Sequence, residues 1–356
     1  FHRAIAFNQP LNFSDTSSVT DMSYMCGDAI AFNQPLDFDT SSVTNMRGML
    51  GSEWDTNEAA RAFNQPLDFD TSSVTDMSYM FQAASAFNQP LNFTDTSSVT
   101  SMTDMFYYAI AFNQPLNFDT SSVKTMSRMF EGAAAFNQEL KFNTSQVILM
   151  NRMFWNARTF NKPLHFTDTS SVLCMQQMFA YASSFNQAVN FNTQNVNRME
   201  YMFFFASAFN QPVAFDTRNV ADMTAMFYNA NSFNQRLPRT FVMDRILTNP
   251  LKPIDLREET YDYGASYEFD DDTQDEINDI RMCTYFATNT NFSEANVWHL
   301  CALAKATGND VYRNTTCYKE INASLVSDRF PQGCPTDDPP PMAPPALPPS
   351  PPPPLP

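Results

Sequence analysis

The sequence is poor in the residues on which most catalytic sites depend. Among 356 residues it has 3 His and 7 Gly, and the histidines His2, His165 and His299 stand apart from one another. No Ser-His-Asp, Cys-His or phosphate-loop grouping is visible. We therefore expect neither enzyme activity nor a bound organic cofactor.

Long apolar runs and positive charge are also scarce. No run approaches the ~18 apolar residues that a membrane-spanning helix needs, so no membrane span is expected. Lys and Arg number 21 against 38 Asp and Glu, for a net charge of −17. Nucleic acid carries charge of the same sign and is excluded as a partner. The chain opens inside a repeat without a signal peptide, and we expect a mature or trimmed product.

Cysteine is rare in the first 250 residues and clustered afterwards. The late cluster predicts two disulfides and an oxidising compartment, because neither a Cys-x-x-Cys pair nor a neighbouring His pair favours zinc. Its members are Cys283, Cys301, Cys317 and Cys334. Of the two lone cysteines, Cys26 is expected to be a buried free thiol. Cys174 is expected on an outward helix position, as a free or capped thiol or as an intermolecular disulfide.

Six Asn-x-Ser/Thr sequences are candidate N-glycosylation sites. Together with the cysteine cluster they favour secretion, although Asn, Ser and Thr are abundant in this chain. The six acceptors are Asn12, Asn92, Asn143, Asn291, Asn314 and Asn322.

What the sequence has in abundance is an internal repeat. Phe-Asn recurs ten times at spacings of 24 or 25 residues, apart from one of 31 caused by a loop between Gly51 and Arg61. Within a unit, Leu11 and Phe13 alternate with polar neighbours and predict a short strand. Residues 15–18 offer helix-capping side chains, and the apolar residues from Val19 to Met25 predict a short helix.

Neither element can bury its apolar face alone, so successive coils must stack. Of 21 Met, 18 fall at two positions of the predicted helix. We expect these thioethers to fill the core rather than to bind copper. The Asn after each Phe predicts an internal ladder of hydrogen bonds between coils. This Asn ladder comprises Asn8, Asn33, Asn64, Asn88, Asn113, Asn137, Asn161, Asn186, Asn210 and Asn234.

The unit AFNQPLDFDTSSVTDMSYMFQAASAFNQPL (62–91) closely resembles the repeat of BspA-like leucine-rich-repeat surface proteins, which also occurs in mycoplasmal lipoproteins and in protist and algal surface proteins. The resemblance covers about residues 1–245. Those relatives usually carry Trp where this chain has Phe13, Phe38 and Phe69, a change that keeps an aromatic ring in the core. The resemblance implies a right-handed solenoid with roles in attachment, display or recognition, and no enzyme activity.

Two polar rows could carry chemistry. An Asp precedes the Thr of most units, and we expect it to form Asx turns or helix caps; the alternative is a calcium-binding row. That candidate calcium row is Asp15, Asp39, Asp70, Asp95 and Asp119. The Thr that follows is present in nine units, from Thr16 to Thr217, and ice binding is its remote alternative.

The remaining features are candidate partner contacts and a distinct C-terminal part. The loop insert with Trp54 could bind a partner. After Asp338 the chain is proline-rich, which predicts a polyproline II rod, and Ser350, Pro351 and Pro352 resemble part of an algal or plant hydroxyproline-glycosylation motif. We expect helices near 273–286 and 293–307 in a disulfide-stapled module.

The predicted fold is thus an α/β solenoid, a leucine-rich-repeat-like stack of about ten strand-helix coils over residues 1–249. A mainly helical cysteine-containing module (250–337) and a polyproline II segment (338–356) follow. The expected function is a structural subunit of an extracellular glycoprotein fibril or surface coat that self-assembles. The alternative is a surface adhesin that binds glycan or protein, and a calcium- or ice-binding solenoid is more remote.

Overall fold

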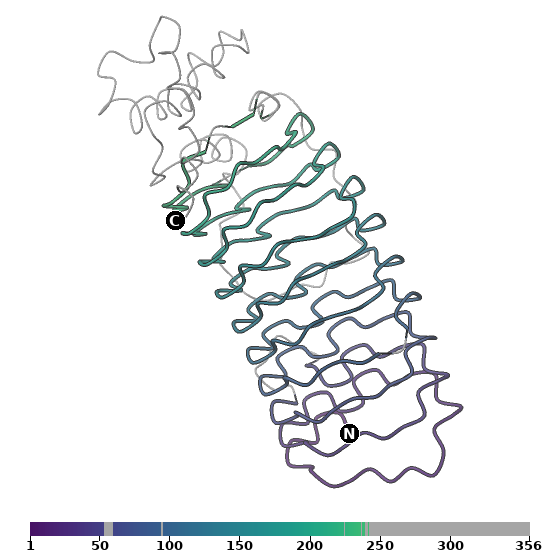
Figure 1. Ribbon diagram of the computed structural model, residues 1–356. Coiled ribbons are helices and arrows are strands. Elements are labelled where there is room, and N and C mark those ends of the chain that lie inside the picture. The colour runs from purple at the N-terminus through teal and green to yellow at the C-terminus, as the bar shows by residue number, and fades with distance from the viewer. Residues whose placement is uncertain (53–59, 94, 224, 236, 239–240, 242–356) are drawn as a thin grey trace, which may run out of the picture.

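The described part of the molecule is a single stack of coils. The computed structural model describes residues 1–52, 60–93, 95–223, 225–235, 237–238 and 241. Figure 1 shows successive coils lying side by side along one axis, so that residues one repeat apart are spatial neighbours. We number the coils 1 to 9 by their Met pairs, from Met22–Met25 to Met223–Met226. The predicted modules 250–337 and 338–356 lie outside the described residues.

Two lines of isolated parallel bridges join the coils, and the described residues contain no longer strand. One line lies at the Leu position of the predicted strand, where Leu67 pairs with Leu91 and Leu140 with Leu164. The other lies one residue before the first Met of each coil, and we call it the bridge row. It comprises Asp21, Asn45, Asp76, Ser101, Thr125, Leu149, Cys174, Arg198 and Asp222.

The predicted helix around the Met pair is wrong, because the described residues contain no helix. Alternate amides close turns instead, as where Met25 N donates to Met22 O at 3.2 Å and Gly27 N to Tyr24 O at 3.0 Å. The intervening amides of Tyr24 and Cys26 donate to carbonyl oxygens of the next coil, that of Tyr24 to Arg47 O at 2.8 Å. An α-helix would use every N–H internally. Apolar side chains at every third residue suit these turns as well as they suit a helix, so the sequence pattern was ambiguous.

Left-handed backbone conformations make these turns possible. The second and sixth residues after the first Met have positive φ in most coils, as at Tyr24 (φ 50°) and Asp28 (φ 55°), or at Tyr201 and Phe205. A positive φ at the third residue of a turn defines the type II geometry. Because few of these residues are Gly, the sequence alone did not reveal the turns.

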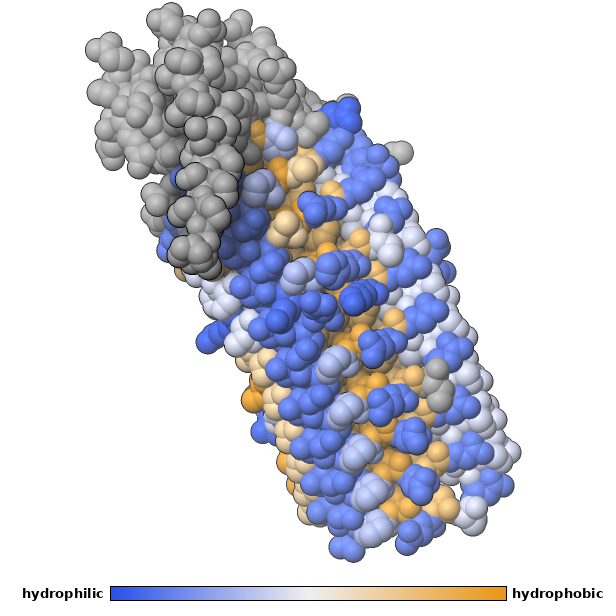
Figure 2. All heavy atoms as spheres, viewed as in Figure 1, coloured by the Kyte–Doolittle hydropathy of each residue, from blue (hydrophilic) through white to orange (hydrophobic). Residues whose placement is uncertain are grey.

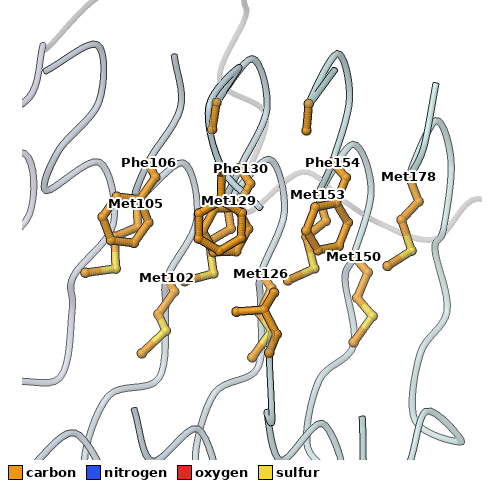
Figure 3. Packing of buried hydrophobic residues seen from close by; sticks show 14 of the residues in the cluster. Met102, Met105, Phe106, Met126, Met129, Phe130, Met150, Met153, Phe154 and Met178 are labelled. Atoms are coloured by element: carbon orange, nitrogen blue, oxygen red, sulfur yellow. The ribbon is translucent and has the colours of Figure 1, made fainter. Parts of the chain in front are cut away.

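Columns of identical side chains fill the interior. In Figure 3 the two Met residues and the following Phe of each coil, such as Met126, Met129 and Phe130, lie in register with their counterparts in the neighbouring coils. Phe130 stacks on Phe106 and Phe154 at 5.6 Å between ring centroids, and on Phe136 of the Phe-Asn pair at 4.1 Å. These rings and thioethers are fully buried, which places the Met positions in the core.

The surface is mostly polar, and the described residues contain no helix that is long and apolar enough to cross a membrane. Figure 2 shows rows of hydrophilic side chains that run along the stack on both sides of a narrow apolar stripe. Each row collects the same position of successive coils, so a surface property that persists through several repeats becomes a continuous band.

Candidate functional site

The repeats differ from one another at three positions that lie together in the turns. These are the second, fifth and sixth residues after the first Met, and we call the surface that they form the turn face. In coil 2 they are Gly48, Gly51 and Ser52, whereas coil 8 has the aromatic residues Tyr201, Phe204 and Phe205. The ladder positions keep their Phe, Asn, Thr and Met throughout, because they must match the coils above and below.

Small residues occupy the turn face in coil 2 for a steric reason. A Cβ on Gly51 would lie 2.0 Å from the carbonyl oxygen of Tyr79 in the next coil. That separation is impossible, so only Gly permits the close approach of these two coils. The larger residues of coils 6 to 9 meet no such requirement.

Six aromatic side chains gather on the turn face of coils 6 to 9. This aromatic patch comprises Trp155, Tyr181, Tyr201, Phe204, Phe205 and Tyr228. Tyr181 touches Trp155 edge-on at 5.5 Å and stacks on Phe205 at 5.2 Å, measured between ring centroids. Such mutual contacts hold the rings in fixed orientations.

The aromatic patch remains partly open to solvent. Tyr181 is 38% exposed and Phe205 is 37% exposed, and the other four rings are half-buried. Elsewhere in coil 6, Ile148 is 39% exposed. Partly exposed aromatic rings in mutual contact form an apolar surface of the kind that marks an interaction site.

A charged cluster lies beside the patch on coils 4 and 5. The guanidinium of Arg128 pairs with Glu131 at 2.9 Å and with Asp104 at 3.4 Å, and it lies 4.5 Å from the centre of the Tyr107 ring. All four residues are buried. Their charged groups pair with one another, so we assign the cluster a structural role.

A second buried acid lies within coil 8. Glu200 accepts a hydrogen bond from Arg198 Nε at 2.7 Å, yet its side chain is only 3% exposed and its Oε2 has no hydrogen-bond partner among the described residues. Burial, assisted by repulsion from Asp222, raises the pKa of Glu200 to about 7. This carboxyl group is therefore close to half-protonated at neutral pH.

The structure brings the ten residues of the Asn ladder together. The backbone N–H of each Asn donates to Oδ1 of the Asn one coil earlier, at 2.8 to 2.9 Å. The next residue, where it is Gln, also donates to that oxygen, as Gln138 does to Asn113 at 3.0 Å. Asn161 is followed by Lys162 in place of Gln. The ladder is part of the fold.

The Asp row forms local turns and the structure gives no support to a calcium site. Asp15 Oδ1 accepts from the amide and hydroxyl of Ser17, at 2.9 and 2.7 Å, and the same pattern recurs at Asp39 and Asp70. These hydrogen bonds lower the pKa of Asp15 and Asp39. Asp95 and Asp119 also cap local amides. The described residues contain no group of three or more His, Cys, Asp or Glu placed to hold a metal ion.

The Thr row argues against ice binding. From Thr16 to Thr193, each Thr hydroxyl donates to the main-chain carbonyl that precedes the next Thr along the stack. Thr40 and Thr120 are typical of the row and are 1% exposed. The hydroxyls thus form hydrogen bonds inside the molecule and are not presented to water as an ice-ordering row.

Both lone cysteines are free and buried. The outward placement predicted for Cys174 is wrong, because this residue belongs to the bridge row and is covered by its neighbours. Burial raises the pKa of Cys26 to about 12 and that of Cys174 to about 11. Thiols with such pKa values are poor nucleophiles at neutral pH.

The candidate glycosylation sites in the described part of the chain differ in exposure. Asn12 and Asn92 are exposed, whereas Asn143 is half-buried and its Oδ1 accepts hydrogen bonds from Ser145. Several predicted residues lie outside the described ones: Asn291, Asn314, Asn322, Trp54, Ser350, Pro351, Pro352 and the four clustered cysteines, Cys283, Cys301, Cys317 and Cys334.

Sequence reasoning missed the aromatic patch. Its residues lie between the repeated positions, and a search for recurring residues passes over them. Aligning the nine coils on their Met pairs would have revealed it, because only coils 4 and 6 to 9 carry aromatic residues at the fifth or sixth position. That these positions share one face could be known only once the turns were seen.

Comparison with known proteins places the chain in a family of repeat proteins. The sequence model of one family matches residues 1–67, 56–141, 93–189 and 162–246, four overlapping segments that together cover the described stack. No curated protein and no solved structure matches the chain. The matched segments make up well over half of the sequence, and the chain therefore belongs to the family described as "Mycoplasma protein of unknown function, DUF285".

Proposed function

We propose that this chain is a non-catalytic recognition module, a surface adhesin of the BspA-like kind, that binds its partner through the turn face. The observation that carries the proposal is the division between repeated and variable positions. The Phe, Asn, Thr and Met residues of the interior columns and ladders recur in every coil, whereas the residues on the turn face differ from coil to coil. A stack with interchangeable coils provides a rigid frame on which one face is free to specialise.

The aromatic patch gives this proposal its chemical content. Six aromatic residues at non-ladder positions are not needed to align the coils, since coils 1 and 2 lack any aromatic side chain at the fifth and sixth positions. Partly exposed aromatic rings are costly in water and valuable at a binding surface, where they remove much apolar area at little cost in conformational entropy.

The proposed location is extracellular, at a cell surface, and the proposed architecture is a leucine-rich-repeat-like solenoid. Support for the location comes from the exposed sequons at Asn12 and Asn92 and from the late cysteine cluster. Fibril or coat assembly remains the other prediction from the sequence. It depends largely on the proline-rich segment outside the described residues, and electron microscopy of the native material would reveal rods with a regular axial repeat if it holds.

Binding of the full chain to cells provides the test. Beads carrying the wild-type chain are compared with beads carrying Tyr181→Ser/Phe205→Ser, and with a control pair, Ser97→Ala/Ser121→Ala, on the Asp-Ser turns of the stack. We expect retention of the wild type and the control on a subset of cell surfaces, and loss of retention for the aromatic variant. Equal retention of all three would show that the turn face does not bind the cells. If electron microscopy shows rods in which this face is buried between subunits, the turn face serves self-assembly and not recognition.

A further inference from the structure

We propose that the aromatic patch binds an extended protein segment that carries carboxylates beside apolar side chains, with Arg152 receiving a carboxylate and Trp155, Tyr181 and Phe205 receiving the apolar groups. This inference rests on the proposed recognition function and names the class of partner.

The first support is the charge of the patch within an acidic chain. The turn face of coils 6 to 9 holds twelve residues, and none of the eleven that surround Arg152 is Asp or Glu: Trp155, Asn156, Gln177, Ala180, Tyr181, Tyr201, Phe204, Phe205, Ala225, Tyr228 and Asn229. The chain as a whole has a net charge of −17. A negatively charged partner therefore meets no like-charged side chain at these turn-face positions.

The second support is that Arg152 is left without a carboxylate. Arg47, Arg128, Arg198 and Arg218 each form an ion pair with Asp or Glu, whereas no ion pair involves Arg152 in the part of the chain that the structure describes. Arg152 is half-buried and shares a turn with Trp155, whose amide donates to Arg152 O at 3.0 Å. A guanidinium is well suited to bind a carboxylate with two parallel hydrogen bonds, and Arg152 stands in the same turn as Trp155.

The third support is composition. The centres of protein interfaces are enriched in Trp, Tyr, Phe and Arg and depleted in Lys, Asp and Glu, and the residues that dominate binding energy are most often Trp, Tyr and Arg. The patch matches both descriptions. A neutral glycan has no carboxylate to pair with the Arg152 guanidinium. The presence of Arg152 therefore favours a protein partner over a neutral carbohydrate.

The shape of the patch explains why the partner segment is expected to be extended. Trp155, Tyr181, Phe204 and Tyr228 belong to four successive coils, and neighbours in this row touch: Trp155 with Tyr181 at 5.5 Å, Tyr181 with Phe204 at 5.4 Å, and Phe204 with Tyr228 at 5.2 Å. The row therefore runs along the stack, parallel to its axis. A chain lying in the same direction would meet one ring after another, with Arg152 at one end.

Selection from a phage-displayed library of short random peptides, with the full-length chain as target, tests the inference. We expect enriched peptides that combine Asp or Glu with Trp, Phe or Leu. A synthetic copy of the most enriched peptide is then titrated against the wild type, Arg152→Glu and Trp155→Ala, with Arg218→Glu as the control for charge reversal outside the patch. Arg152→Glu and Trp155→Ala should each weaken binding about tenfold or more, and added salt should weaken the wild type.

Folding is controlled by thermal melting of every variant and by Trp155→Phe, which should retain most of the affinity. The inference is overturned if no acidic peptide is enriched, or if the enriched peptides bind Arg152→Glu as tightly as the wild type. It is also overturned if a glycan array gives hits that depend on Trp155 while the peptides do not bind. Binding to cells that survives Trp155→Ala but is lost on substitution of Tyr24 and Tyr79 in coils 1 and 3 would contradict this inference and leave the recognition function intact.

Discussion

Each Asn of the ladder links two coils because its side-chain oxygen takes the place of a missing backbone acceptor. In coil after coil, the amide of the following Asn would otherwise be buried without a partner, which costs about 1 to 3 kcal/mol per group. The Gln that follows strengthens the same link, since its amide also reaches the Asn oxygen. The Asn is thus required by the fold and the Gln only assists.

Asn113→Ala is expected to lower the free energy of unfolding by about 1 to 3 kcal/mol. It removes the acceptor of the Asn137 amide, which lies 2.9 Å away in the wild type. Gln138 Nε2 loses Oδ1 as one of its two acceptors and keeps the main-chain oxygen of residue 113. Urea denaturation followed by circular dichroism gives the difference. The control Gln138→Ala keeps the Asn137 bond and should cost less than about 1 kcal/mol. Equal losses for the two variants would contradict the assignment.

The raised pKa of Glu200 predicts that the free energy of unfolding falls as the pH rises. Its pKa is raised from 4.5 to about 7 in the folded chain. Protonated Glu200 therefore stabilises the fold fully below about pH 4.5, and this contribution is lost as the pH rises through about 7. Glu200→Gln cannot ionise, so its advantage over the wild type should grow from near zero at pH 4.5 to about 3 kcal/mol at pH 8.

Thermal melting across this pH range measures the effect of Glu200→Gln. Glu139→Gln removes one negative charge from an exposed position and serves as the control. An advantage of Glu200→Gln that stays constant with pH would show that Arg198, and not burial, decides the charge of Glu200.

At the scale of the element, the repeating piece is a run of turns and not a helix. The turns let alternate amides bond to the next coil while the others bond within their own coil. Their cost is a left-handed backbone at residues other than Gly, about 1 to 2 kcal/mol each. The hydrogen bonds between coils outweigh this cost, and no isolated coil has them.

Ala83→Gly tests the turn geometry, because Ala83 has a φ of 54°. Gly adopts this conformation without strain but loses more entropy on folding, so we expect a stability that is unchanged or up to about 1 kcal/mol higher. The neighbouring Ala84 has no positive φ and is fully buried. Ala84→Gly should therefore lower stability by about 1 kcal/mol or more. Denaturation of both variants distinguishes the cases, and a helix at this place would make both substitutions destabilising.

At the scale of the whole molecule, stability accumulates along the stack. Each coil contacts only its two neighbours, so the columns of Phe and Met transmit packing from one end to the other. A defect in a central coil is shared by two interfaces and divides the stack into two shorter ones.

Phe130→Ala in coil 5 is expected to lower stability by about 3 to 5 kcal/mol, because the ring is fully buried and stacked on both sides. It should also broaden the melting transition or divide it into two steps as the halves unfold separately. Differential scanning calorimetry records both effects. Ile110→Ala, at a site that is 48% exposed, should change stability by less than about 1 kcal/mol. A sharp single transition in Phe130→Ala would contradict the nearest-neighbour description.

The sequence by itself determined the repeat, its register and its core. Phe-Asn, Asp-Thr-Ser and the Met pair recur at constant spacing, and a residue that recurs in every coil must meet its own copies. The stacked Asn and Thr residues and the buried Met columns follow from that spacing.

Only the tertiary structure decided that the Met segment is turned and not helical, that Cys174 lies inside, and that aromatic residues from four coils form one patch. The reason is physical, because covalent geometry sets only the spacing of residues along the chain. The other features depend on contacts that exist only after the coils have stacked. These are the amide that bonds to the next coil, the thiol covered by its neighbours, and the ring that touches a ring 23 to 26 residues away.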